Sequence, residues 1–500
     1  MKITHFPWLF LTLLFQISLL CVLATGQCLD SQRSLLLQLK QSLTFDTSLS
    51  TKLVQWNQTT KDCCNWRGVT CSKNGGRVIG LDLDNEGIRS EIKSSSTLFR
   101  LHFLEKLNLA SNSFNGTQIP SGLLNLSSLV YLNLSNSFSG QVPNVFSRMK
   151  KLAVLDLSNA YSLKIEHPKL SIIVQNLTQL AELYLDTVDM STQGSDWSRA
   201  ISSSLPNLRI LSLTNCRITG PIHSSFGKLQ FLSVIKLDGN SLNVPFPESF
   251  ANLSNLKILS LHSCNFSGVF PQRILQIPTL QTLRLSYNDL LKGSLPEFPR
   301  NGSLRELFLY NTNFSGGVPE SIGNMARLYD IDLSQSSFSG RIPQSMVKLT
   351  QLVRLDFAYN KFSGEIPIPP KIYEYADYSS NDFSSSIPPN IGDNISAAYF
   401  FSASRNNLTG IIPESICNAK NLAVLDLSYN RLNGKIPSCL LHKRKVLKVL
   451  KLGHNNFTGN LSGTFFKGRG LKSLDLHANQ LEIVPTFNLQ NNHINGTVRK

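Results

Sequence analysis

The aspartates that could act as acid and base in this chain share one position in a short pattern. Each stands between the two apolar residues of an L-x-L tripeptide. Two carboxylates held close together can hydrolyse a glycosidic bond. The alternative, which we favour, is that Asp at this position solubilises the exposed face of a strand. The aspartates are Asp156, Asp332, Asp356, Asp426 and Asp475.

Other catalytic motifs are absent from the sequence. It contains no Gly-rich phosphate-binding loop with its Lys, no kinase catalytic loop and no H-E-x-x-H pair of metal ligands. We therefore predict a binding protein rather than an enzyme, with no cofactor and no metal ion.

Four cysteines lie close together near the N-terminus, at Cys28, Cys63, Cys64 and Cys71. Zinc sites use spaced pairs of ligands, which the adjacent Cys63 and Cys64 fit poorly. In an oxidising compartment such a cluster predicts two disulfides. We prefer the pairs Cys28–Cys63 and Cys64–Cys71, although four cysteines permit three pairings.

The first 26 residues predict export from the cell. A short basic segment with Lys2 and His5 precedes an apolar stretch over residues 9–23, and small residues follow up to Gly26. We therefore assign residues 1–26 to a signal peptide cleaved after Gly26. The alternative is an N-terminal membrane anchor, which the shortness of the apolar stretch disfavours.

The composition indicates a folded protein with a sparsely charged surface. Hydrophobic residues make up 41% of the chain and charged residues 16%, which is not a disordered composition. The formal net charge of +16 favours acidic partners such as pectic polysaccharide or acidic proteins. The export signal argues against nucleic acid. We interpret the basic run at residues 442–445 as a solvated turn; a binding patch is the alternative.

A repeat of about 24 residues must position all these side chains. Its frame is L-x-x-L-x-L-x-x-N-x-F-x-G-x-I-P, as in LYDIDLSQSSFSGRIP from Leu328. We count about 18 copies, some of them irregular. In the most regular part, the Asn-type position is occupied by Cys216, Asn240, Cys264, Asn288, Thr312, Ser336 and Asn360.

The repeat frame predicts a stack of short strands. The L-x-L alternation buries one face of each strand, and no single repeat can bury its leucines alone. The Asn should satisfy backbone groups where the strand ends, with a weaker contact where Cys, Ser or Thr replaces it. Gly-x-Ile-Pro should give a turn and a second short extended segment. The fold class is therefore an α/β repeat solenoid with a parallel β-sheet on its concave face.

Four more cysteines lie inside the repeats. Cys417 and Cys439 are 22 residues apart, at similar places in neighbouring repeats, so stacking could bring them within disulfide distance. A free pair is the alternative. Cys216 and Cys264 are two repeats apart, too far to bridge, and are expected to be buried thiols.

Function should lie on the concave face, at the x positions around the strand leucines. Several large amphipathic residues recur there, and Tyr and Arg are typical of binding hot spots. Phe308 has no evident packing role inside its own repeat. Lateral stacking between strands is the alternative for each residue. The predicted ligand-binding residues are Tyr184, Lys236, Asp238, His262, Arg284, Tyr287, Phe308, Tyr310, Arg354 and Tyr359.

The chain contains many N-x-S/T sequons, which suit a glycosylated exported protein. A glycan on Asn133 would block the concave face, so we leave that site out. The predicted glycosylation sites are Asn57, Asn115, Asn125, Asn176, Asn252, Asn265, Asn301, Asn313, Asn394, Asn407, Asn456, Asn460 and Asn495.

Three segments carry a resemblance to a known family. Endings such as Gly340-Arg341-Ile342-Pro343 resemble the plant-specific class of leucine-rich repeats, and CCNWRGVTC before Ser72 resembles the N-terminal cap of plant receptor-like proteins and receptor kinases. Two further segments resemble the Verticillium-resistance (Ve) branch of receptor-like proteins, which are relatives of the Cf receptors. They are LAELYLDTVDMSTQGSDW from Leu180 and SSSLPNLRILSL from Ser202.

The resemblance implies a plant-type leucine-rich-repeat superhelix with a disulfide-bonded N-terminal cap. Its domains would be a cap at 27–77 and repeats at 78–500. It also implies a kinase-less ectodomain that senses pathogen or self-derived ligands (peptide, protein or glycan) in innate immunity. Such receptors signal through an adaptor receptor kinase and a SERK-type co-receptor. The alternatives are a secreted inhibitor or decoy that binds wall-degrading enzymes or pectin, and the outer half of a receptor kinase.

The C-terminal end departs from this family's pattern. The last Asn-type positions, Asn479 and Asn492, are 13 residues apart, and no capping Cys pair precedes Lys500. We expect a C-terminally truncated gene model or a non-functional paralogue, with a genuine short secreted form as the alternative. We expect a protein with this sequence to be secreted into the apoplast. If the full architecture of the family applies, we expect a single-pass protein of the plasma membrane.

Overall fold

The computed structural model describes residues 27–160, 162–367, 371–441, 446–461 and 471–483. The chain forms two compact units, Met1–Phe231 and Leu232–Lys500, each described here by itself. The predicted signal peptide, the basic run at 442–445 and the sequon at Asn495 lie outside the described residues. Among the helices in the described ranges, none combines the length and the apolar character needed to cross a membrane.

The first unit begins with a disulfide-bonded cap. Helix α2 (Asp30–Ser42) buries Leu36 and Leu39, and the rings of Trp56 and Trp66 stack with centroids 5.5 Å apart. Strand β1 (Val69–Cys71) pairs antiparallel with β2 (Val78–Asp82), the first strand of the repeats. The short helices η1 (Leu53–Gln55) and η2 (Cys63–Asn65) complete the cap.

A buried Glu joins the cap to the first repeat. Glu86 occupies the Asn-type position and is fully buried. Its carboxylate accepts hydrogen bonds from the backbone N–H groups of Thr51, Lys52 and Leu53 at 2.9–3.1 Å. A carboxylate suits this place because it accepts several of the unpaired N–H groups at a helix N-terminus.

The repeats of the first unit form a parallel sheet. One leucine from each strand pairs in register with the next, from Leu81 to Leu211, and all of them are buried. The strands are β2, β3 (Lys106–Asn108), β4 (Tyr131–Asn133), β6 (Val154–Asp156), β8 (Glu182–Tyr184) and β9 (Ile210–Ser212).

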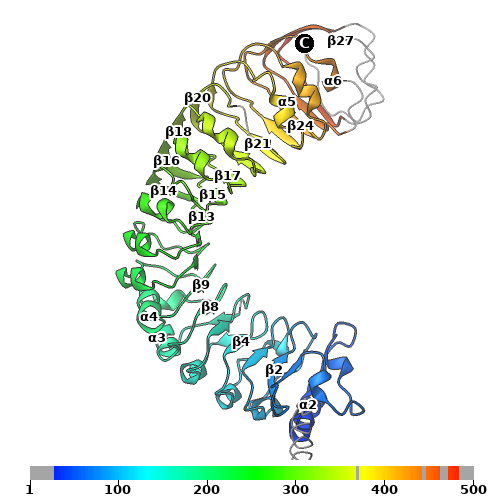
Figure 1. Cartoon of the computed structure of the whole chain (residues 1–500), viewed down its shortest axis with the longest axis vertical. Coiled ribbons are helices and arrows are strands. Elements are labelled where there is room, and N and C mark those ends of the chain that lie inside the picture. Colours follow the sequence, from blue (N-terminus) through cyan, green and yellow to red (C-terminus); the bar gives the residue numbers. More distant parts are fainter. Residues whose placement is uncertain (1–26, 161, 368–370, 442–445, 462–470, 484–500) are drawn as a thin grey trace, which may run out of the picture. The chain divides into compact units, whose positions relative to one another are not determined.

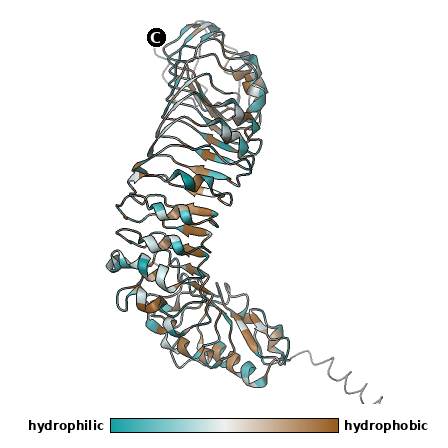
Figure 2. Ribbon diagram, turned by 60° about the vertical axis from the view of Figure 1, so that its left-hand side comes forward, coloured by the Kyte–Doolittle hydropathy of each residue, from teal (hydrophilic) through white to brown (hydrophobic). Residues whose placement is uncertain are grey.

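The strands of the second unit pair in the same parallel pattern (Figure 1). Its strands are β10 (Val234–Lys236), β11 (Ile258–Ser260), β13 (Thr282–Arg284), β15 (Glu306–Phe308), β17 (Asp330–Asp332), β19 (Arg354–Asp356), β21 (Tyr375–Asp377), β23 (Phe400–Ser402), β24 (Val424–Asp426), β26 (Val449–Lys451) and β28 (Ser473–Asp475). Figure 2 shows that apolar residues concentrate on the strands.

A second extended segment of two to six residues follows the turn of many repeats, as predicted. In the most regular repeats it ends at the Gly of Gly-x-Ile-Pro, as β18 does at Gly340, and the Pro then precedes a short 3-10 helix, as Pro343 does for η12 (Gln344–Lys348). These segments are β5 (Gly140–Gln141), β7 (Leu163–Lys164), β12 (Gly268–Val269), β14 (Asn288–Gly293), β16 (Thr312–Gly316), β18 (Ser337–Gly340), β20 (Lys361–Gly364), β22 (Asp382–Phe383), β25 (Asn433–Gly434), β27 (Asn456–Leu461) and β29 (Gln480–Ile483).

Short helices close most of the repeats on the side opposite the main strands, and most are 3-10 helices. The α-helices among them are α3 (Leu170–Val174), α4 (Asp196–Ser204), α5 (Ile391–Asn394) and α6 (Ser438–Leu441). The 3-10 helices are η3 (Thr97–Arg100), η4 (Phe114–Gly116), η5 (Ser121–Asn125), η6 (Asn144–Arg148), η7 (Ser191–Gln193), η8 (Ser224–Lys228), η9 (Glu248–Asn252), η10 (Gln272–Gln276), η11 (Glu320–Asn324), η12 and η13 (Glu414–Asn418).

The predicted ladder at the strand ends is confirmed. The amide of Asn288 donates to the carbonyls of Leu261 and Leu285 at 2.9 and 2.7 Å, and its oxygen accepts from the N–H of Phe266 at 2.8 Å. The thiol of Cys264, in the preceding repeat, donates to the carbonyl of Leu237 at 3.1 Å. Cys therefore supplies a hydrogen-bond donor, as Asn does, but it has no amide oxygen to accept a backbone N–H.

The prediction that the L-x-L aspartates are solvent-facing is wrong for two of them. Asp332 and Asp356 are only 3% and 8% exposed, because side chains on strands about 4.8 Å apart cover one another. Each accepts a hydrogen bond from the backbone N–H two residues on, Ser334 at 3.0 Å and Ala358 at 3.2 Å. These aspartates therefore terminate the strand instead of solubilising its face.

Candidate ligand-binding face

Charged and aromatic side chains gather on strands β13 to β23 of the second unit. The first and third residues of each strand point away from the core, and parallel pairing places equivalent residues side by side. We call this set the strand-face site. It comprises Arg284, Glu306, Phe308, Asp330, Asp332, Arg354, Asp356, Tyr375, Asp377 and Phe400.

One end of the strand-face site is built around Arg284. Its guanidinium donates to Glu306 Oε2 from Nη2 at 2.8 Å and from Nε at 3.2 Å, and lies 5.1 Å from the centre of the Phe308 ring. Phe308 is half-buried: one part of its ring packs against Arg284, and its contact with a ligand stays a prediction. Burial alone would raise the pKa of Glu306, but hydrogen bonds from Tyr329 and Arg284 outweigh it and lower that pKa.

Arg354 lies at the centre of the strand-face site and faces three carboxylates. Its Nη2 is 2.8 Å from Asp332 Oδ2 and 3.4 Å from Asp356 Oδ2, and its Nη1 is 3.9 Å from Asp330 Oδ1. Burial raises the pKa of Asp330 to about 6 and that of Asp356 to about 7, and the like charge of Asp332 adds to both shifts. Three carboxyl groups thus share one guanidinium, and the excess negative charge develops as Asp330 and Asp356 lose their protons.

Two aromatic rings form the far end of the strand-face site. Tyr375 and Phe400 stack with ring centroids 4.4 Å apart, and the Arg354 guanidinium lies 5.4 Å from the centre of the Tyr375 ring. The Tyr375 hydroxyl donates to Asp377 Oδ2 at 3.2 Å. Burial raises the pKa of Asp377, although the hydrogen bonds from Ser379 and Tyr375 oppose the shift.

A second aromatic group lies beside Arg284, where the strands end. His262, Tyr287 and Tyr310 form a cluster with ring centroids 4.9–6.2 Å apart. Tyr287 is 48% exposed. Burial raises the pKa of Tyr310, and neighbouring Tyr287 contributes to the shift. The structure therefore brings together six predicted residues, which are His262, Arg284, Tyr287, Phe308, Tyr310 and Arg354.

The other four predicted residues have different surroundings. Tyr184 belongs to the first unit, where its hydroxyl donates to Glu182 at 2.9 Å. Asp238 accepts hydrogen bonds from the Ser260 hydroxyl and the His262 N–H, both at 2.7 Å, so it holds the adjacent repeat. Lys236 is exposed at the end of β10, and Tyr359 is 57% exposed after β19.

Sequence reasoning missed several members of the strand-face site, namely Glu306, Asp330, Tyr375, Asp377 and Phe400. Glu306, Asp330, Arg354, Tyr375 and Phe400 are the first residues of five successive strands. Reading that one column across the aligned repeats would have found all of the missed residues except Asp377, which is the third residue of its strand. Tyr375 and Asp377 escaped because their repeat, with Ala376 between them, lacks the leucine pattern.

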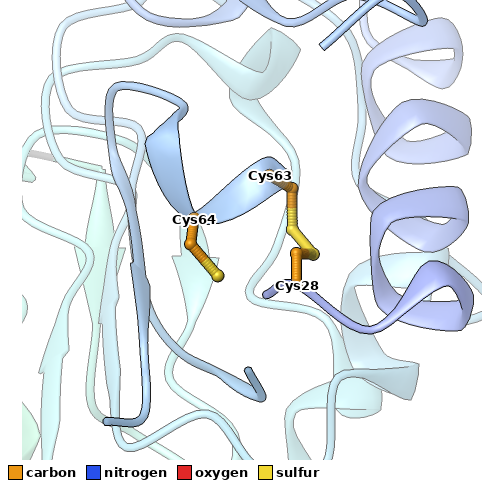
Figure 3. A group of neighbouring side chains, drawn as sticks. All are labelled: Cys28, Cys63 and Cys64. Atoms are coloured by element: carbon orange, nitrogen blue, oxygen red, sulfur yellow. A yellow bond between two sulfur atoms is a disulfide. The ribbon is translucent and has the colours of Figure 1, made fainter. Parts of the chain in front are cut away.

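The predicted disulfide pairs are present, and they leave no thiolate for a metal ion among the three cysteines drawn in Figure 3. The sulfur atoms of Cys28, Cys63 and Cys64 lie within 4.8 Å of one another. Cys28 is bonded to Cys63 (Figure 3) and Cys64 to Cys71, with Cα atoms 5.3 and 5.5 Å apart. Cys417 and Cys439 also form a disulfide, with Cα atoms 5.8 Å apart.

Cys216 and Cys264, which form no disulfide, are both buried, as predicted. Burial raises the pKa of both thiols, that of Cys264 to about 12. A thiol with so high a pKa is unreactive, because the thiolate is the nucleophile.

Two kinds of family model match the chain. "Leucine rich repeat N-terminal domain" matches residues 29–72. "Leucine rich repeat" matches residues 206–266, 232–290, 303–325 and 421–442.

Among curated proteins, the chain is similar to Receptor-like protein 6 of Arabidopsis thaliana, with 32% identity over 264 residues, which is 46% of this chain and 25% of the relative. It is also similar to Receptor-like protein EIX2 of Solanum lycopersicum, with 37% identity over 129 residues, 24% of this chain and 12% of the relative. The matched region thus spans a quarter or less of these relatives.

Two solved structures share the fold. The Arabidopsis receptor kinase HAESA, in complex with the peptide hormone IDA and the co-receptor SERK1, has a TM-score of 0.72 and 25% identity, covering 91% of this chain and 86% of that chain. The plant peptide hormone receptor RGFR1, in complex with RGF2, has a TM-score of 0.68 and 27% identity, covering 84% of this chain and 76% of that chain.

Proposed function

Because this chain is a leucine-rich-repeat protein whose homologues are plant receptor-like proteins, we propose that it is the extracellular ligand-recognition part of a kinase-less receptor. The strand-face site carries this proposal. In it, large aromatic and Arg side chains, the types that dominate binding energy, stand on adjacent strands of a rigid sheet. We further propose that the receptor acts in plant innate immunity and belongs to the Ve branch.

A peptide or protein ligand is the best match to the strand-face site. Successive strands place equivalent side chains at regular intervals, which suits an extended chain lying across them. The solved structures of similar fold were obtained with peptide hormones bound. Carboxylates outnumber guanidinium groups here, so the ligand should bring a basic group to Asp356 and Asp377.

The site supports binding rather than catalysis. Asp332 and Asp356 are the pair of L-x-L carboxylates that lie closest to a common partner, but both are held by Arg354 and by backbone N–H groups. Because Arg354 and the backbone already engage both carboxylates, we infer that neither attacks a sugar. We therefore propose a non-catalytic protein whose output depends on partners, an adaptor receptor kinase and a SERK-type co-receptor.

Location and glycosylation belong to the same proposal. We propose that residues 27–500 lie in the apoplast, at the plasma membrane if the full family architecture applies, with glycans on the predicted sequons. Several of these sequons, such as Asn265, Asn313 and Asn407, directly follow the Asn-type position and are exposed. Glycans there would leave the strand-face site open.

The test is a selection of random 12-residue peptides on the purified full chain, followed by affinity measurements on variants. Phe308→Ala should weaken the selected peptides by about 2 kcal/mol, roughly thirtyfold in Kd. Phe103→Ala is the matched control, because Phe103 also lies under an arginine, with Arg77 4.3 Å from its ring centre, but in the first unit. Equal losses in both variants, or none in Phe308→Ala, would reject the strand-face site.

A further inference from the structure

Two histidines from different repeats face each other near the C-terminal end of the second unit. His454 follows β26 and His477 follows β28, and their Nε2 atoms are 2.8 Å apart. The residues are 23 positions apart in sequence, so no ligand-spacing motif reveals them. Only the stacking of repeats brings the two ring nitrogens to one point.

A carboxylate fixes the orientation of one ring. Asp475 Oδ1 accepts a hydrogen bond from the His477 backbone N–H at 3.2 Å and also contacts His477 Nδ1. A proton held on Nδ1 leaves the lone pair on Nε2, directed at His454. Metal-binding histidines in proteins commonly have such a carboxylate behind the ring.

Gly453 makes room for this pair of side chains. A Cβ atom at Gly453 would lie 2.7 Å from Asp475 Oδ1 and 2.9 Å from His477 Nδ1. The equivalent positions in the four preceding repeats hold Ala358, Ser379, Ser404 and Ser428. Glycine at this one place therefore admits an arrangement that its neighbours would block.

The other ring is held by stacking. His454 lies against Tyr429, with ring centroids 4.1 Å apart, and the Arg405 guanidinium is 4.5 Å from the centre of the Tyr429 ring. The two imidazoles are nearly perpendicular, at 82°. Both Nε2 atoms are thus positioned before any ion arrives, which lowers the entropic cost of binding.

We propose that His454 and His477 form a binding site for a divalent transition-metal ion of the zinc–copper group, with Asp475 as a positioning residue. Imidazole nitrogen suits these metals. Zinc–nitrogen bonds of about 2.0–2.1 Å at a tetrahedral angle need the nitrogens about 3.3 Å apart, so the rings must separate by roughly half an ångström. His477 is about 40% exposed, so water or a carboxylate of a binding partner can complete the coordination.

Calorimetric titration of the full chain with Zn²⁺ at pH 7.5 tests the site. We expect one site that is lost in His454→Gln and in His477→Gln. It should persist in His102→Gln, a control that removes an exposed histidine of the first unit. Asp475→Asn keeps both ligands and should weaken binding by about 10- to 100-fold. Binding should also weaken at pH 5.5, because protons compete for the ligands.

Unfolding curves measured without metal show whether each variant is folded. Cu²⁺ bound to the wild-type chain should also show coupling to two ring nitrogens in its electron paramagnetic resonance spectrum. The proposal is overturned if folded His454→Gln and His477→Gln variants bind Zn²⁺ as the wild-type chain does. It is also overturned if the wild-type chain binds Zn²⁺ no more tightly than a variant that carries both substitutions. Peptide binding at the strand-face site is unaffected by either result.

Discussion

At the scale of single residues, Asp356 shows how packing between repeats changes the chemistry of a common repeat position. Its carboxylate is buried between Asp332 and Asp377, with only part of the Arg354 charge to compensate it. Burial, reinforced by those two like charges, raises its pKa to about 7. The unfolded chain, in contrast, has a pKa near 3.9 for Asp.

The sign of the resulting pH dependence follows from proton linkage. Because the folded pKa is above the unfolded one, the native state binds more protons between about pH 4 and about pH 7. The free energy of unfolding therefore falls as pH rises through this window. Above about pH 7 the cost of holding a charged Asp356 is fully present, and Asp330, with a pKa of about 6, acts in the same direction.

Asp356→Asn should therefore stabilise the protein at pH 8 and have little effect at pH 4. The amide keeps the oxygen that accepts from Ala358 and removes the charge. We expect a gain on the order of 2 kcal/mol at pH 8, since each pKa unit is about 1.4 kcal/mol and screening reduces the full shift. Urea unfolding at several pH values measures it.

Asp426→Asn is the matched control for this prediction. Asp426 has the same strand position and the same backbone hydrogen bond, to Ser428 at 3.1 Å, but it faces Lys451 at 3.6 Å. It should give no gain at pH 8. If Asp356→Asn follows the wild-type pH profile, the carboxylate is not destabilised by its surroundings.

At the scale of the repeat, much of the structure could be predicted from sequence. The L-x-L frame located the strands, and the Asn-type position located the ladder, because both depend on local alternation and on one side chain per repeat. Burial of Asp332 and Asp356 could not be predicted this way, since it depends on lateral neighbours two dozen residues away. The contacts of Glu86 with the cap, and of His454 with His477, have the same origin.

The ladder leads to a prediction about its two kinds of member. Asn288→Ala removes hydrogen bonds to three carbonyls and two backbone N–H groups, all buried, and should cost about 3 kcal/mol or more in the free energy of unfolding. Cys264→Ala removes one thiol donor and should cost about 1 kcal/mol. Guanidinium unfolding followed by circular dichroism compares them. Equal costs would mean that the Asn amide contributes no more than a thiol.

At the scale of the whole molecule, the charge of the chain and that of the strand-face site have opposite signs. The chain has 48 basic and 32 acidic residues, a net charge of +16. The strand-face site has five carboxylates and two arginines among its members. The positive charge must therefore be distributed over other surfaces. A basic protein with one acidic site can adhere to an acidic polymer and still leave that site open to a basic ligand.

This separation predicts that wall adhesion and ligand recognition respond to different changes. The full chain should be retained on immobilised polygalacturonate at 20 mM salt and released well below 500 mM, because exposed charges are screened within about 10 Å at 0.1 M. Phe308→Ala should weaken peptide binding roughly thirtyfold and leave this retention unchanged. Fully methyl-esterified pectin, which lacks the carboxylates, is the matched control and should not retain the protein. If retention persists on the esterified polymer or resists salt, the net charge does not drive adhesion.

If Phe308→Ala also lowers retention on polygalacturonate, the polysaccharide competes for the strand-face site, and pectin becomes a candidate for the ligand itself.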